Sequence, residues 1–287
     1  MRIVRYLAPG AKAPAVGIIV RGDKISEVPG SGGDLGVLTL LDTAGLRQVA
    51  SAATVTHDLK KVKLLAPVGR PGKILCLAAN YHPTDKRKEV NLDRDTPKFF
   101  IKPSSAMVGP DEAISYFPVT TSLIQEIELG VVIGKPGRNI SKEKALDHVF
   151  GYTIINDVSS RSLNFAKERE NVYYFDWLNG KWLDGHCPVG PWVVDKASIA
   201  DPHKLSLKTY VNGELRIDSS TSNMIFDIGR QIEYISKMCV LEPGDLIATG
   251  VALAKAGEGE KMLQPGDVIE GVVEGVGKLT NPVVKAS

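Results

Sequence analysis

Short apolar segments that end at proline and glycine turns run through most of the chain. Segments at 73–78, 129–133 and 151–156 have the length and the bounding turns of buried strands. Further strong turn sequences are Asn-Gly at 212–213 and Pro-Gly-Asp at 243–245 and at 265–267. Because the strands do not alternate regularly with helices, a doubly wound parallel sheet is disfavoured. The pattern predicts a mixed, β-rich α+β fold.

Helical periodicity is confined to a few segments. The residues Ile225, Ile228, Ile232 and Ile235 lie at helical spacing and predict a helix over about 223–238. Shorter helices are predicted at 43–53, 141–148 and 159–169.

The first 70 residues resemble a small unit of their own. Apolar runs at 16–20 and 25–28 flank a polar turn and predict a β-hairpin. The stretch 66–72 is dense in proline and glycine, which is typical of a boundary between domains. We therefore expect a small N-terminal α+β domain over 1–70 and a larger, strand-dominated domain over 71–287.

Composition excludes several classes of partner. The chain has 35 Lys+Arg against 33 Asp+Glu, so it lacks the concentrated basic face that nucleic acid requires. No apolar run approaches the roughly 20 residues that cross a bilayer, and the first residues have no signal-peptide core. The three cysteines Cys76, Cys187 and Cys239 are widely spaced, which indicates reduced thiols. We expect a cytoplasmic protein that binds neither nucleic acid nor membrane.

Two glutamates open the apolar segment at 129–133. If Glu126 and Glu128 lie on one strand, their side chains share a face at roughly 7 Å. Adjacent carboxylates repel each other and resist burial. The pair is harmless where the strand faces solvent, whereas on a buried face it requires a cation between the carboxylates.

A third carboxylate, Asp157, follows the apolar segment at 151–156. By itself, Asp157 could simply cap the helix predicted from Ser159. Together with Glu126 and Glu128, it would form the minimal oxygen ligand set of a hard divalent metal ion. With no histidine or cysteine nearby in the sequence, Mg²⁺ or Mn²⁺ is favoured over Zn²⁺, and Ca²⁺ would also fit oxygen ligands.

These acids belong to a series of short motifs in a fixed order. The series comprises Glu126-x-Glu128, Gly151-Tyr152-Thr153, Asn156-Asp157, Trp177 through Asp184, Cys187-Pro188, Val211 through Glu214, Leu241 through Gly250 and Gly275 through Asn281. Each motif is weak alone, but the ordered series is specific. Over about residues 72–284 the chain resembles the fumarylacetoacetate hydrolase family.

The resemblance implies the family's mixed β-roll, usually a homodimer, and a small oxo-acid substrate. It implies that Glu126, Glu128 and Asp157 bind the metal, which acts as a Lewis acid. Lys181 would be an active-site lysine that stabilises an oxyanion, although by sequence alone it could be a surface residue after a turn. The residues that the resemblance places beside the substrate are Arg161, Asn164, Lys102 and Thr249. For Arg161 a structural acid is an equally good partner.

The chain departs from the family pattern where the general base is expected. The family motif has a histidine and then a glutamate after its Asn-Tyr pair, and here Thr84 and Arg87 stand in those positions. His82 lies two residues early. It is the candidate base if its loop closes onto the substrate, and an ordinary loop histidine otherwise.

The expected function is metal-dependent hydrolysis of a carbon–carbon bond in a small 1,3-dioxo acid of the acylpyruvate type. Decarboxylation, tautomerisation or hydration of an oxo acid on the same metal site is the alternative. Decarboxylation, tautomerisation and dehydration ask less of an activated water than carbon–carbon hydrolysis does. A relative that binds a metabolite without turnover is the alternative of another class. The displaced His82 favours that alternative, and three inward-facing acids argue against it.

Overall fold

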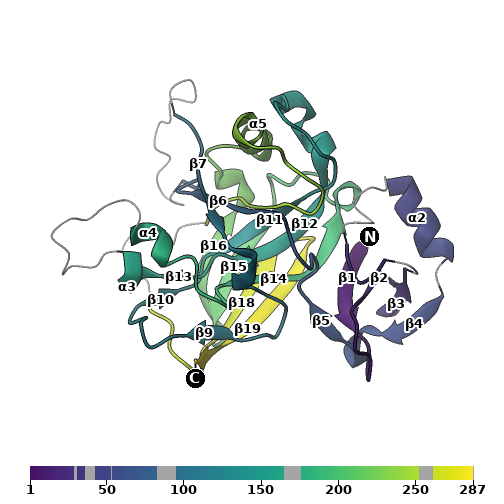
Figure 1. Cartoon of the computed structure of the whole chain (residues 1–287), viewed down its shortest axis with the longest axis horizontal. Coiled ribbons are helices and arrows are strands. Elements are labelled where there is room, and N and C mark those ends of the chain that lie inside the picture. The colour runs from purple at the N-terminus through teal and green to yellow at the C-terminus, as the bar shows by residue number, and fades with distance from the viewer. Residues whose placement is uncertain are drawn as a thin grey trace.

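The protein is described from a computed structural model, in which residues 1–28, 31–35, 43–52, 54–82, 95–164, 176–251 and 261–286 are placed. Strands dominate and helices are short (Figure 1). The β-rich α+β class predicted from the turn-rich sequence is confirmed. Among the described helices, none has the length and apolarity needed to cross a bilayer.

A 12-stranded mixed sheet forms the body of the molecule. Its main path runs through β4 (Val55–Asp58), β3 (Lys24–Glu27), β2 (Ala15–Val20), β1 (Arg2–Leu7), β14 (Cys187–Asp195), β12 (Val149–Asn156), β11 (Ile127–Ile133), β17 (Leu246–Ala248), β6 (Ile74–Ala78) and β7 (Lys98–Lys102). Off this path, β5 (Lys63–Leu65) pairs with β1 and β8 (Met107–Val108) pairs with β14. The path departs from sequence order, so it places distant segments side by side.

A second sheet has five strands. In spatial order they are β16 (Glu214–Ser220), β15 (Ser206–Val211), β18 (Val268–Val273), β19 (Gly277–Lys285) and β9 (Ile114–Tyr116). The hairpin between β15 and β16 turns at Asn212 and Gly213, whose φ angles are 53° and 77°. Positive φ at both positions is what an Asn-Gly hairpin turn provides. A separate two-stranded pair joins β10 (Leu123–Ile124) to β13 (Ser159–Ser160).

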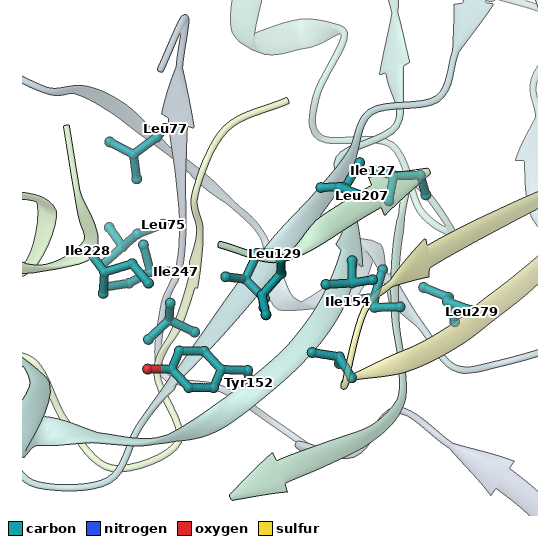
Figure 2. Close-up of a cluster of buried hydrophobic side chains, with 14 of the residues drawn as sticks. Leu75, Leu77, Ile127, Leu129, Tyr152, Ile154, Leu207, Ile228, Ile247 and Leu279 are labelled. Carbon is teal, nitrogen blue, oxygen red and sulfur yellow. The ribbon is translucent and has the colours of Figure 1, made fainter. Parts of the chain in front are cut away.

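The main hydrophobic core lies between the two sheets and helix α5 (Ile228–Met238). Strand β11 turns Ile127 and Leu129 into it, and Figure 2 shows them near Leu207 of β15. Alternation along β11 sends Glu128 to the opposite face. The apolar face of β11 therefore anchors the strand in the core, and the opposite face carries the carboxylate of Glu128.

The N-terminal strands and helix α2 (Thr43–Ala52) lie together at one side of the molecule (Figure 1). The predicted hairpin is present as β2 and β3, and α2 matches the helix expected over 43–53. Strand β1 pairs antiparallel with β14, with Ile3 opposite Val193, so this unit extends the large sheet. The division of the chain near residue 70 stays a prediction.

Helix α5 begins later than the isoleucine spacing predicts. The side chain of Asp227 accepts a hydrogen bond from the backbone N–H of Arg230 at 2.7 Å and caps the helix, so Ile225 precedes it. The segment before the cap contains the 3₁₀ helix η5 (Thr221–Asn223).

Two other predicted helices also differ. The segment at 141–148 forms the 3₁₀ helix η3 (Lys142–His148), and the helix expected from residue 159 is replaced at first by β13 and then continues as α3 (Arg161–Asn164). Residues 165–169 lie outside the described part. The remaining short helices are η1 (Leu59–Lys61), η2 (Ser104–Ala106), α4 (Asp176–Asn179) and η4 (Lys196–Ser198).

Candidate metal centre and active site

The antiparallel pairing of β11 with β12 brings the three predicted acids together. The register sets Ile127 opposite Asn156, and the N–H of Asp157 donates to the carbonyl of Glu126 at 2.8 Å. The start of β11 therefore meets the end of β12. Glu126, Glu128 and Asp157 each contribute one carboxylate oxygen to a group whose members lie within 4.8 Å of one another.

All three carboxyl groups are buried, with exposed fractions of 8% for Glu126 and 1% for both Glu128 and Asp157. The alternative of a solvent-facing pair is therefore wrong. Burial raises the pKa of Glu128 well above its usual range, and the charges of Asp157 and Glu126 raise it further. Burial also raises the pKa of Glu126, although the nearby Lys181 ammonium opposes this effect. Three ionised carboxylates this close together would require compensating cations.

Two buried ammonium groups supply part of that compensation. Lys181 Nζ donates to Glu126 Oε2 at 2.6 Å and to Asp157 Oδ2 at 2.7 Å. Lys102 Nζ lies 2.8 Å from Asp157 Oδ1 and donates to the carbonyl of Val158 at 3.1 Å. Burial would raise the pKa of Asp157, but the two lysines outweigh it and hold that pKa below its usual value.

The surroundings of Lys181 decide its state of protonation. Its side chain is 3% exposed, so the reading as a surface lysine is wrong. Burial lowers the pKa of its ammonium, but Asp157 and Glu126 more than offset this, and the net shift is upward. Lys181 is therefore a cation near neutral pH, and it can donate hydrogen bonds to an anionic oxygen rather than accept a proton.

The turn after β17 closes over Glu128. The N–H of Gly250 donates to Glu128 Oε2 at 2.5 Å. Gly250 has a φ of +103°, and a Cβ there would lie 2.8 Å from the Cβ of Asn80, so only glycine fits. The hydroxyl of Thr249 donates to the carbonyl of Leu129 at 2.9 Å, which fixes the turn on β11. A substrate contact of Thr249 stays a prediction.

Two asparagines that sequence analysis gave no role support this arrangement. The side chain of Asn80 donates to the carbonyls of Thr249 and Phe226 at 2.7 and 3.1 Å. Asn156 accepts the N–H of Glu126 at 2.9 Å through its side-chain oxygen. Asn156 ends β12 inside a matched motif, and Asn80 follows β6 in the Asn-Tyr pair. These positions were the only signal of a role in the sequence.

Of the other predicted site residues, the structure describes some side chains and not others. Arg161 Nη2 lies 3.4 Å from Glu126 Oε1, and its side chain is 38% exposed. The N–H of His82 donates to the carbonyl of Asn223 at 2.9 Å, and its Nδ1 is buried with no hydrogen-bond partner among the described residues. Asn164 ends α3, and its side chain lies outside the described part of the chain, as do Thr84 and Arg87.

The donor set fits a hard divalent cation. It consists of carboxylate oxygens, which Mg²⁺, Mn²⁺ and Ca²⁺ prefer. Within the described residues, no lysine or arginine forms an ion pair with Glu128, whereas Glu126 and Asp157 each do. A metal ion among the three oxygens would supply the missing counter-charge.

Comparison with known proteins agrees with this geometry. The family model described as fumarylacetoacetate (FAA) hydrolase C-terminal matches residues 73–284. The chain belongs to the fumarylacetoacetate hydrolase family. The resemblance seen in the ordered motifs is thereby confirmed, and the large sheet and its companion are this family's fold.

Three relatives indicate what members of the fumarylacetoacetate hydrolase family do. Oxaloacetate tautomerase YisK of Bacillus subtilis is 42% identical over 234 residues, which cover 79% of this chain and 75% of that protein. Fumarylacetoacetate hydrolase of Exiguobacterium antarcticum has a TM-score of 0.82 at 33% identity, with both chains fully covered. Maleylpyruvate hydrolase of Sphingobium sp. SYK-6, solved with manganese(II) and pyruvate, has a TM-score of 0.79 at 30% identity, again over both full chains.

The fumarylacetoacetate hydrolase family thus contains enzymes of more than one reaction type. Its members include a tautomerase and hydrolases that act on small oxo acids. The buried acid group of this chain is capable of binding a divalent metal, and one relative holds manganese.

Proposed function

We propose that this protein is a metal-dependent enzyme that interconverts the keto and enol forms of a small 2-oxo acid, with oxaloacetate as the leading substrate. The observation that carries the proposal is the ammonium of Lys181 beside the group formed by Glu126, Glu128 and Asp157. Mg²⁺ or Mn²⁺ bound there would act as a Lewis acid on the oxo and carboxylate oxygens of the substrate.

The residues of the chain divide the remaining work. Enolisation leaves negative charge on the oxo oxygen, and the permanent ammonium of Lys181 is suited to donate a hydrogen bond to it. Arg161 is the more exposed cation beside the acids and could bind a substrate carboxylate. His82 is the candidate for moving the proton from the carbon next to the oxo group.

We rank tautomerisation above hydrolysis because it does not require a base that activates water. Hydrolysis of a carbon–carbon bond requires an activated water, and this chain has Thr84 and Arg87 where the family carries its histidine and glutamate. Enolisation needs no attacking water, and the carbon between the oxo and carboxyl groups of oxaloacetate is already acidic. The similarity to an oxaloacetate tautomerase supports the same order.

Hydrolysis of an acylpyruvate-type dioxo acid is the second candidate. It is supported by the full-length similarity to a maleylpyruvate hydrolase and by the buried Nδ1 of His82. In this case His82→Ala should lower the rate of hydrolysis by roughly 10²-fold or more. A His82→Ala variant with wild-type hydrolysis would leave this histidine as an ordinary loop residue.

The deciding experiment compares substrates on metal-stripped protein with and without added Mg²⁺ or Mn²⁺. Metal-dependent loss of the ultraviolet absorbance of enol-oxaloacetate, without release of pyruvate, would support the tautomerase. Metal-dependent release of pyruvate from an acylpyruvate would support the hydrolase instead. Metal binding without turnover of either compound would favour a metabolite-binding relative. A homodimer and a cytoplasmic location stay predictions, and sedimentation analysis tests the first.

A further inference from the structure

Lys102 lies at a position of β7 where the alternation of buried and exposed side chains predicts an apolar residue. In β7 the side chains of Phe100 and Lys102 are buried, whereas Ile101 between them is exposed. The side chain of Lys102 is fully enclosed, with an exposed fraction of 0%. Lysine is almost never buried to this extent unless its charge is paired. The enclosed ammonium therefore needs a specific explanation.

Among the described residues, the ammonium of Lys102 has its polar contacts in one short segment. Its Nζ meets Oδ1 of Asp157 at 2.8 Å and the carbonyl of the next residue, Val158, at 3.1 Å. The other oxygen of the carboxylate, Oδ2, receives Lys181 at 2.7 Å. The two oxygens of Asp157 thus lie against cations from different parts of the chain, Oδ1 in an ion pair and Oδ2 in a hydrogen bond, and rotation of the carboxylate would disturb both contacts.

We propose that Lys102 is a positioning residue that fixes the orientation of Asp157 for metal binding, and that it does not bind substrate. This inference rests on the metal site of the proposed function. Lys102 reaches Oδ1 of Asp157 and the carbonyl of Val158, whereas Oδ2 shares the ammonium of Lys181 with Oε2 of Glu126. Residues that orient a metal ligand typically contribute roughly 10- to 100-fold to metal affinity. We expect loss of Lys102 to weaken metal binding by a factor of about that size.

The chain offers a matched control for this lysine. Lys73 Nζ lies 2.8 Å from Oδ2 of the fully buried Asp245, so the pair repeats the lysine–aspartate contact of Lys102 and Asp157. Lys73 differs in being 21% exposed and in having Glu242 as a second partner at 3.4 Å. Asp245 is not a member of the acid group. A variant of Lys73 therefore reports the general cost of removing a lysine from a buried aspartate in this fold.

The test is a calorimetric titration of the metal-stripped full chain with MnCl₂, for wild type, Lys102→Met, Lys102→Gln and Lys73→Met. Lys102→Met should raise the Kd for Mn²⁺ about 10- to 100-fold. Lys102→Gln keeps a hydrogen-bond donor and should give a smaller increase, and Lys73→Met should leave the Kd unchanged. Circular dichroism checks the folding of each variant, and Lys102→Gln decides the matter if Lys102→Met does not fold.

Three results would overturn the inference. The first is wild-type Mn²⁺ affinity in both Lys102 variants. The second is tighter Mn²⁺ binding in both variants, which would mean that the ammonium competes with the metal. The third is an unchanged Mn²⁺ Kd with weakened binding of oxalate at saturating Mn²⁺, which would make Lys102 a substrate ligand. If wild type itself bound no Mn²⁺, the proposed function would fail, and this inference with it.

Discussion

Two buried aspartates in this fold each meet a lysine at 2.8 Å, yet they lie in very different surroundings. Asp245 belongs to a Pro-Gly-Asp turn, where Oδ1 accepts the N–H of Lys73 at 2.9 Å and Oδ2 accepts the N–H of Glu242 at 2.8 Å. Asp157 has two ammonium partners and lies within 4.8 Å of two further carboxylates.

This difference in surroundings distinguishes a structural aspartate, Asp245, from a candidate metal ligand, Asp157. At Asp245, one ammonium and two backbone N–H groups satisfy one carboxylate, and nothing further is required. At Asp157, three acids share two buried ammonium groups and the partly exposed Arg161, and Glu128 has no direct ion-pair partner among the described residues. Removing one partner of a buried pair destabilises a protein, whereas a crowded acid group makes a place for a further cation.

The sharpest way to break this comparison is Glu128→Gln. The substitution keeps the shape of the side chain but removes the carboxylate that lacks a direct ammonium partner, so the fold should remain. Affinity for Mn²⁺ should fall by more than the roughly 10- to 100-fold that outer residues contribute. Titration calorimetry measures the affinity, and unchanged metal binding would exclude Glu128 as a ligand.

A second test removes Lys181, the cation that the proposed function assigns to the oxo oxygen of the substrate. Lys181→Met should lower kcat for oxaloacetate tautomerisation about 10²- to 10³-fold at saturating Mn²⁺, because the developing oxyanion loses a hydrogen-bond donor. Steady-state kinetics measure the effect, and the metal titration serves as control for an intact site. Wild-type turnover in this variant would limit Lys181 to a counter-ion for Glu126 and Asp157.

The structural pair should respond in stability and not in metal affinity. Asp245→Asn leaves Lys73 with only the exposed Glu242, at 3.4 Å, as counter-charge and sets an amide N–H where an acceptor is needed, so the free energy of unfolding should fall by about 2–3 kcal/mol. Urea denaturation measures this change. A loss of Mn²⁺ affinity in Asp245→Asn would show that the two aspartates are coupled, contrary to the comparison.

The smallest effect is expected at the other Pro-Gly-Asp turn. Asp267 accepts hydrogen bonds from the side chain of Asn212 and the N–H of Gln264, both at 2.7 Å and both near solvent. Because water can replace these partners, Asp267→Asn should change the free energy of unfolding by less than about 1 kcal/mol. A cost in urea denaturation as large as that of Asp245→Asn would mean that burial does not explain the difference between the two turns.

Several elements of the fold could be predicted because their signals are local. The Asn212-Gly213 hairpin and the strands around 73–78, 129–133 and 151–156 follow from turn chemistry and short apolar runs. The helix expected from Ser159 failed because residues 159–160 pair with β10 instead. Tertiary pairing overrode a local preference there, as it commonly does for short helical segments.

The acids of the candidate site were predictable from alternation and motif order, but their partners were not. Gly250 donates to Glu128 across 122 residues of sequence, and Lys102 reaches Val158 across 56. No window of the sequence contains both members of such a contact.

The sequence by itself determined where this chain turns, which strand faces are apolar, and which acids end up at strand ends. Only the tertiary structure decided that the start of β11 meets the end of β12, that the turn after β17 closes over Glu128, and that Lys102 is enclosed against Asp157. Turn and strand preferences act over a few neighbouring residues, whereas strand register is set by apolar faces that must be buried together across the whole sheet.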